Sequence, residues 1–531
     1  MTPETRQRHR LRRRASVWVV AGCLLLPACT ASPTPAKTGP RAELAASAVR
    51  EVQCAQDISG TVLGDVQCLM VAVPLHRDSS AVDAEASRDG GETIEVHVTR
   101  LAPPSGIASR SPVLVVPAVA ATPNYLGLAP MAQRTERELI IVDGRGAGHS
   151  DPALTCPELT AHATWELSQA PAPHEARARY LRAVGQCADR LRIDGVDPTA
   201  FSVAETAADL VDVRQALGIN RWAVTAIGSA ARFVPALMAE DGDAVEAVLL
   251  DSPEQPGLDP VAAATELTAH VIHQLLTACA KDLRCDQAHP AARRLWAAAK
   301  AAVVRKDLRL PAGSLGTVPV DSALLLRLVR ATITDGGSSG DSFTPTSLPA
   351  VLEGIAAGGS DLLSEEVGPL LDAQDPFCLG YHTDCLKRMS LAAGTHLSIL
   401  CPTVMPTDTA TERRHQPAAA EVFSRRLDPQ ACRRFGTAID APPPDPYNWS
   451  APTLVFAGRY APATPLPTVR NLVHQLPAAS LIIDPAGADN VMPRTECTLG
   501  LRRAWLDNPQ ATVAAPPCLS RLRIEWYLGH R

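Results

Sequence analysis

The chain has 531 residues, of which 20% are charged and 46% are hydrophobic, a balance typical of a globular protein with a large core. The net charge is −6, and removal of residues 1–28, with their six arginines and one glutamate, lowers it to about −11. An acidic body without a basic patch argues against nucleic acid as a partner. No later run of about 18 apolar residues occurs, so no transmembrane helix is expected.

The first 29 residues have the pattern of a targeting segment. Arginines dominate residues 6–14, and residues 15–26 form an apolar stretch too short to span a bilayer. The stretch ends in Leu-Pro-Ala-Cys, which resembles a bacterial lipobox, in which the cysteine, here Cys29, is lipidated. We therefore expect export and lipid anchoring on the outer face of a bacterial cell membrane, with residues 30–53 as a tether leading into the fold. An ordinary secretory signal with a chance cysteine is the alternative, and Sec and twin-arginine export both stay open.

The chain contains 14 cysteines, of which Cys23 lies in the apolar stretch and Cys29 is the lipidation candidate. The remaining even number favours disulfides in an exported protein, and pairing in sequence order gives six modest loops. A zinc site is the rival interpretation, but the sequence has no Cys-x2-Cys knuckle and no clustered histidines, so no metal or cofactor is expected. The disulfide candidates are Cys54, Cys68, Cys156, Cys187, Cys279, Cys285, Cys378, Cys385, Cys401, Cys432, Cys497 and Cys518.

Alternation and apolar runs predict the strands in chain order. Residues 68–75 and 93–100 alternate as an antiparallel edge pair, whereas residues 112–117, 138–143, 222–225, 248–252, 451–458 and 480–484 read as buried strands. Helices are predicted at residues 127–132, 232–240, 258–305 and 499–506. Alternation of strands with helices indicates a mostly parallel sheet with right-handed crossovers.

A glycine-rich loop follows the strand predicted at residues 138–143. Residues 143–150 read Asp-Gly-Arg-Gly-Ala-Gly-His-Ser, which matches the Asp-x-Arg-Gly-x-Gly-x-Ser pattern of α/β-hydrolases. Glycines permit the tight turn that this loop requires. We expect Asp143 and Arg145 to pin it.

The chain resembles the secreted tripeptidyl aminopeptidase and proline iminopeptidase branch (peptidase S33 type) of actinobacterial α/β-hydrolases. The resemblance runs from Cys54 to Cys518 and includes residues 151–158, 187–191, 201–210 and 248–252. It implies an α/β-hydrolase fold with a parallel sheet, helices on both faces and an inserted helical cap. The implied organisation is a core at residues 54–257 and 431–531, whose last part resembles the C-terminal region of that branch, with the cap at residues 258–430.

The resemblance also implies a catalytic triad, and this chain departs from it at every position. The nucleophile elbow Gly-x-Ser-x-Gly aligns with residues 226–230, which puts Gly228 at the place of the serine. Ala461 stands where the acid is expected, and Asp489 stands where the histidine is expected. The loop after the strand at residues 112–117, which supplies oxyanion donors in such enzymes, has no glycine between residues 117 and 123.

These replacements predict a hydrolase-like protein that has lost its activity, because each removes a different requirement of the reaction. Its expected role is to bind a peptide or cell-envelope ligand, or to scaffold a protein partner. A third possibility is a structural envelope lipoprotein whose cleft has filled in.

An active serine hydrolase or aminopeptidase is the alternative, with Ser229 as a relocated nucleophile. His149 or His474 would then have to act as the base, although each also fits an ordinary loop or surface position. Carboxylates at strand ends, Asp143, Asp251 and Asp484, are interpreted as caps of the turns that follow.

Overall fold

A computed structural model describes residues 48–59, 65–77, 92–103, 110–119, 128, 131, 135–169, 171–254, 260–305, 308–311, 316–334, 347–358, 392–403, 428–437, 447–489, 495–511 and 513–528. The predicted signal segment and Cys29 lie outside these residues, as do Cys378, Cys385 and residues 120–123. Within the described residues, no helix combines the length and the apolar character that crossing a membrane requires.

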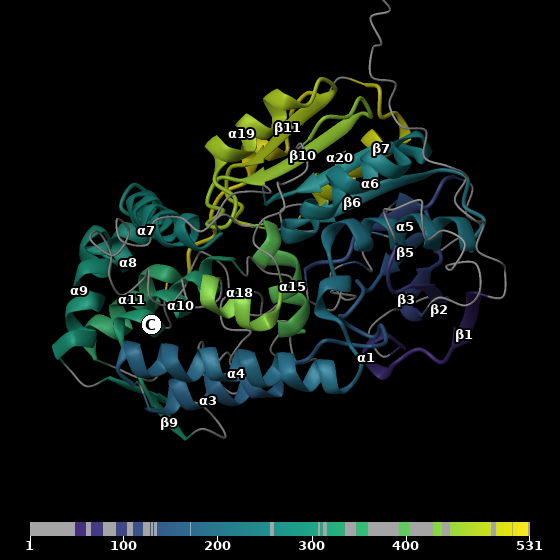
Figure 1. The fold of residues 1–531 in the computed structure, drawn as a ribbon. Coiled ribbons are helices and arrows are strands. Elements are labelled where there is room, and N and C mark those ends of the chain that lie inside the picture. The colour runs from purple at the N-terminus through teal and green to yellow at the C-terminus, as the bar shows by residue number, and fades with distance from the viewer. Residues whose placement is uncertain are drawn as a thin grey trace, which may run out of the picture. The chain divides into compact units, whose positions relative to one another are not determined.

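A nine-stranded sheet forms the centre of the fold (Figure 1). Its first three strands pair antiparallel, β3 also pairs antiparallel with β5, and all remaining neighbours pair parallel. This confirms the predicted edge pair and the mostly parallel sheet. In spatial order the strands are β1 (Val49–Val52), β2 (Val66–Pro74), β3 (Thr93–Leu101), β5 (Leu139–Val142), β4 (Val113–Val115), β6 (Trp222–Ile227), β7 (Val245–Asp251), β10 (Thr453–Gly458) and β11 (Ala479–Asp484).

Apolar side chains on both faces of the sheet hold helices on both sides. Along β6, Trp222 and Val224 belong to one hydrophobic cluster, whereas Ala223 belongs to another, because successive side chains point to opposite faces. On the first face pack α5 (Val203–Ala216), α6 (Val234–Asp241) and α19 (Leu466–Gln475), and residues of α4 (Pro173–Ile193) belong to the same hydrophobic cluster. On the second face pack α1 (Gln56–Ser59) and α20 (Glu496–Asp507). The described parts of the predicted helix at residues 127–132, Leu128 and Met131, are helical and buried on this second face.

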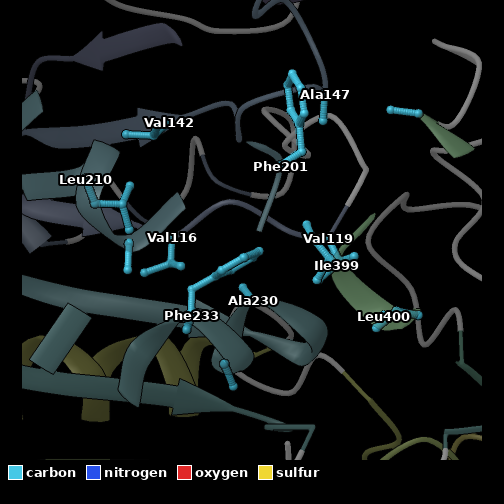
Figure 2. Packing of buried hydrophobic residues seen from close by; sticks show 14 of the residues in the cluster. Val116, Val119, Val142, Ala147, Phe201, Leu210, Ala230, Phe233, Ile399 and Leu400 are labelled. Carbon is cyan, nitrogen blue, oxygen red and sulfur yellow. The ribbon is translucent and has the colours of Figure 1, made fainter. Parts of the chain in front are cut away.

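The segment between β7 and β10 divides between two hydrophobic clusters. Its first part forms a cluster with Leu167 of α3 (Pro157–Gln169). This part contains α7 (Pro260–Cys279), α8 (Leu283–Ala288), α9 (Ala292–Arg305), α10 (Ser322–Thr334), α11 (Leu348–Ala357) and the hairpin of β8 (Arg309–Pro311) with β9 (Thr317–Pro319). Its second part, α15 (Ala393–Thr403) and α18 (Pro429–Phe435), instead joins the cluster of the sheet and α4. Figure 2 shows that second arrangement, with Ile399 and Leu400 of α15 among the buried residues that include Val119 and Phe233.

Disulfides form between the described cysteines, as predicted, and they join in sequence order, a connectivity that the sequence alone left open. The bonds are Cys54–Cys68, Cys156–Cys187, Cys279–Cys285, Cys401–Cys432 and Cys497–Cys518. Each closes a local loop, and the bond between α15 and α18 ties together two helices of the inserted segment.

Candidate functional site

The turn after β6 has the geometry of a strained strand-to-helix connection. β6 ends at Ile227, the 3₁₀ helix η4 (Gly228–Phe233) begins at once, and α6 follows. The predicted helix at residues 232–240 therefore starts two residues later as an α-helix, because its first turn is wound as 3₁₀. Gly228 has φ +56°, in the left-handed region, whereas Ser229 has no positive φ. A Cβ atom built on Gly228 would meet no heavy atom within 4 Å, so the space beside this residue is open.

The hydroxyl of Ser229 is held by the loop after β4. The backbone N–H of Val119 donates to Ser229 Oγ at 3.3 Å. Val119 is buried, while Gly228 and Ser229 are half-buried. The loop after β4 and the residue after the nucleophile are the two places that supply oxyanion donors in α/β-hydrolases. In this protein a backbone N–H of the loop after β4 donates to the side chain of Ser229.

A charged pair that the sequence did not single out lies next to this turn. The backbone N–H of Glu254, three residues after β7, donates to the carbonyl oxygen of Gly228 at 3.1 Å. Arg232, which is only 3% exposed, brings Nε and Nη2 to within 3.4 Å of Glu254 Oε2. Tyr447 donates its hydroxyl to the carbonyl oxygen of Glu254 at 3.3 Å. No motif marks this pair in the sequence, because neither residue occupies a triad position.

The loops after β10 and β11, predicted to carry the acid and the base, meet in the structure. Ala461 and Asp489 are both buried. The Asp489 carboxylate accepts from the hydroxyl of Thr464 at 3.2 Å and from the backbone N–H of Ala463 at 3.4 Å. A Cβ atom on Gly458 would lie 1.9 Å from the carbonyl oxygen of Ala488, so this glycine permits the close approach of the two loops. Asp489 is thus an acceptor that fastens one loop to the other.

The loop at residues 143–150 is pinned by Arg145, as predicted. Its guanidinium group is fully buried and donates from Nε and Nη2 to both carboxylate oxygens of Asp209, at 2.7 and 2.6 Å. It also donates from Nη1 to the carbonyl oxygens of Leu75 and Ala200. Such a bidentate, fully hydrogen-bonded arginine explains the motif by structure alone, without a catalytic role.

His149, one of the two proposed bases, bonds to Asp143. Its Nδ1 lies 2.9 Å from Asp143 Oδ2, and its backbone N–H donates to the same oxygen at 2.7 Å. Burial alone raises the pKa of Asp143, but the hydrogen bonds from His149 and the electrostatic interaction with the nearby His97 imidazole outweigh this and lower the pKa to about 2. His474, the other proposed base, is exposed in the last turn of α19.

The remaining strand-end carboxylates lie where the sequence predicted them. Asp484 is fully buried and accepts from the backbone N–H of Ala486 at 2.8 Å, so it caps the turn after β11. Asp251, at the end of β7, is also fully buried and accepts from the hydroxyl of Ser252 at 2.9 Å. The charge of Asp251 also acts on Arg502 of α20, whose pKa burial lowers.

Comparison with known proteins adds similarity at the level of architecture. No protein-family model and no curated protein matches the chain. Among solved structures, an α/β-hydrolase fold protein from Chitinophaga pinensis shares 14% identity over 78% of this chain and 94% of its own, with a TM-score of 0.35. A proline iminopeptidase of Mycobacterium smegmatis shares 14% identity over 78% and 96%, with a TM-score of 0.34. A probable hydrolytic enzyme from Pseudomonas aeruginosa shares 11% identity over 85% and 96%, with a TM-score of 0.35.

Those TM-scores are low, so the fold is assigned from the geometry of the chain itself. The sheet combines an antiparallel edge with a parallel centre, a glycine-rich loop follows β5, and a strained turn at Gly228 joins β6 to a helix. The chain therefore has the α/β-hydrolase fold.

Proposed function

We propose that this protein is an exported, lipid-anchored relative of the tripeptidyl aminopeptidase and proline iminopeptidase branch that has lost hydrolytic activity. In this proposal it binds a peptide or cell-envelope ligand beside Gly228 or scaffolds a protein partner. Cys29 carries the lipid anchor.

The position of the elbow supports the loss of the nucleophile. In an α/β-hydrolase the nucleophile sits on the strained residue of the strand-to-helix turn. The positive φ at Gly228 supports its assignment to that place, and glycine offers no nucleophilic atom. Ser229 follows it with ordinary backbone geometry. A one-residue shift that would make Ser229 the nucleophile therefore has no support from the backbone.

The hydrogen bond from Val119 to Ser229 is the observation that carries the proposal. A nucleophilic hydroxyl must give its proton to a base, and among the described residues the hydrogen bond of the Ser229 hydroxyl is one accepted from Val119 N–H, which supplies no base. The same contact engages an N–H group that an oxyanion would require. An active Ser229 would thus need a base beside its hydroxyl, and Val119 N–H would have to turn from this hydroxyl to the oxyanion.

The acid and base loops support the same conclusion. Ala461 has no group that orients an imidazole, and Asp489 accepts hydrogen bonds from Ala463 and Thr464. An aspartate near neutral pH is already ionised and cannot replace histidine as a proton shuttle. The space that a Cβ atom on Gly228 would enter is empty within 4 Å, which is compatible with a ligand approaching this residue.

A fluorophosphonate serine-hydrolase probe tests the loss of activity. Wild-type protein and Ser229→Ala are incubated with the probe, and the adduct is measured by intact mass. We expect no stoichiometric adduct on either protein, while an active serine hydrolase labelled in parallel confirms the reagent. A wild-type adduct that disappears in Ser229→Ala would establish the active alternative and refute the proposal.

The disulfides support the export part of the proposal, because such bonds persist in oxidising compartments. Metabolic labelling with an alkyne fatty acid in a lipoprotein-processing bacterium tests the anchor. Wild-type protein is expected to incorporate the label and to sediment with membranes, whereas Cys29→Ala is expected to do neither. Equal labelling of both proteins, or of neither, would reject Cys29 as the lipid site.

A further inference from the structure

Two histidines and an aspartate that the triad does not use converge at the end of β5. His149 Nδ1 lies 2.9 Å from Asp143 Oδ2, and His97 Nδ1 lies 3.5 Å from the same oxygen. The ligating atoms of the three residues all lie within 4.8 Å of one another, and the two rings have centroids 5.0 Å apart. Isolated histidines in the sequence therefore form a cluster in space, contrary to the expectation drawn from their spacing.

The register of the sheet explains how these residues meet. β3 pairs antiparallel with β5 so that Val98 lies opposite Val142, and one further step places His97 opposite Asp143. The backbone N–H of Asp143 donates to the carbonyl oxygen of His97 at 2.9 Å, which confirms this step. The glycine-rich loop then turns back sharply enough to bring His149 to the same carboxylate.

The loop at residues 143–150 packs closely against the side chain of Asp143. Gly148 has φ +59°, and a Cβ atom at this position would lie 2.4 Å from Asp143 Oδ2. Ser150 donates its hydroxyl to the carbonyl oxygen of Asp143 and accepts from the backbone N–H of His97 at 3.0 Å. The backbone on both sides of the cluster is thus fixed before any ligand binds.

His97 Nδ1 gives the cluster an unsatisfied group. The residue is 3% exposed, and within the described part of the chain this nitrogen has no hydrogen-bond partner. Burial of a polar atom without a partner costs free energy, so such an atom calls for an explanation. Its distance of 3.5 Å from Asp143 Oδ2 is long for a hydrogen bond but suits two ligands of one metal ion.

We propose that His97 Nδ1, His149 Nδ1 and Asp143 Oδ2 bind one divalent transition-metal ion of the zinc class. Two imidazoles and a carboxylate suit zinc and its neighbours, whereas magnesium and calcium prefer oxygen ligands alone. On binding, each ligating Nδ1 donates its lone pair to the metal, and the proton of each neutral ring resides on Nε2. His149 is partly exposed, which leaves a coordination position open to water on that side.

The site is independent of the lost triad, because none of its ligands lies on the turn at Gly228. It joins strand β3 to the loop after β5, and it adds to the hydrogen bonds that already hold this loop. Binding to the native state therefore raises the stability of the fold.

Cobalt binding to the untagged mature protein tests the proposal. Metal is first removed with a chelator, and Co²⁺ is titrated while the visible absorption of the cobalt and the metal content per chain are measured. We expect one Co²⁺ per chain with a nitrogen-rich coordination spectrum, displaced by Zn²⁺. His149→Gln is expected to weaken binding by about 100-fold or more, since even outer-shell partners contribute about 10–100-fold. The matched control is His474→Gln, which removes an exposed histidine on α19 and should bind as the wild type does.

Circular dichroism verifies that the variants are folded. If His149→Gln does not fold, X-ray absorption spectroscopy of the zinc-loaded wild type tests the ligand set instead. We expect two imidazoles and at least one oxygen donor around the metal. Absence of stoichiometric Co²⁺ binding, undiminished binding by folded His149→Gln, or a metal environment without two imidazoles would each overturn the proposal.

Discussion

Substitution of Gly228 by alanine measures the strain of the elbow directly. The added Cβ meets no heavy atom within 4 Å, so the left-handed backbone at φ +56° is the main source of cost. A non-glycine residue there costs about 1–2 kcal/mol. Gly148→Ala is the matched comparison, because its φ of +59° is nearly the same but its Cβ would lie 2.4 Å from Asp143 Oδ2. We expect a loss well above 2 kcal/mol there, roughly 3 kcal/mol or more, because a steric clash adds to the strain.

Urea unfolding followed by far-ultraviolet circular dichroism gives both values under one set of conditions. The expected order of stability is wild type, Gly228→Ala, then Gly148→Ala. If Gly228 had ordinary helical or extended backbone, alanine would instead be neutral or stabilising by about 0.5–1 kcal/mol. A neutral or stabilising Gly228→Ala would therefore refute the positive φ, and with it the assignment of Gly228 as the elbow residue.

Further stability predictions concern buried charges, a buried phenol and a disulfide. Asp251→Asn should lower the free energy of unfolding in urea, because it removes a buried negative charge that acts on the buried guanidinium group of Arg502; an unchanged free energy of unfolding would contradict this. Burial raises the pKa of Tyr447 above its usual value of 10.0. Wild-type stability should therefore fall as pH rises above about 10, where only the unfolded tyrosine ionises. Tyr447→Phe should flatten that fall, and an unchanged slope would exclude the phenol as its cause. Replacement of Cys156 and Cys187 by alanine should cost about 3–4 kcal/mol, because their disulfide closes a 31-residue separation; calorimetry showing no loss would contradict the estimate.

Local patterns predicted the strands of the sheet except β1 (Val49–Val52), which lies in the segment predicted as a tether. The alternation in residues 93–100 became β3, with Val96 and Val98 buried on one face and Thr99 on the other. Buried parallel strands read as apolar runs because both of their faces pack against helices. Burial and side-chain period act within a few residues, so the sequence reveals them without knowledge of the rest of the fold.

Contacts between distant loops could not be read in the same way. Nothing local indicates that Val119 donates to Ser229, or that Arg232 pairs with Glu254 beside the elbow. The meeting of His97 with Asp143 depends on the register of two strands, and a shift of one residue would turn His97 to the other face. Sequence motifs located the triad positions, whereas these contacts depend on tertiary packing.

The meeting of the loops after β10 and β11 follows from the fold. Gly458 permits close approach to Ala488, and this meeting follows from the parallel neighbours β10 and β11. The fold thus brings the loops that carry Ala461 and Asp489 together.

An attempt to restore activity distinguishes a missing triad from a blocked oxyanion donor, the two defects that the proposal assigns to this protein. Gly228→Ser, Ala461→Asp and Asp489→His together return the three triad side chains, and the open space at Gly228 admits the new hydroxyl. In this triple variant Val119 N–H still donates to the hydroxyl of Ser229. Addition of Ser229→Ala frees that donor for an oxyanion.

One oxyanion donor is worth about 10²–10³ in turnover, so the fourth substitution should raise ester hydrolysis by a comparable factor over the triple variant. The rate of hydrolysis of a p-nitrophenyl ester is compared among the wild type, Ser229→Ala, the triple variant and the quadruple variant. Ser229→Ala alone is expected to be inactive. Equal rates for the triple and quadruple variants, both above the wild type, would show that the Ser229 hydroxyl does not occupy the oxyanion donor. The loss at Gly228 would then be a loss of the nucleophile and its partners alone.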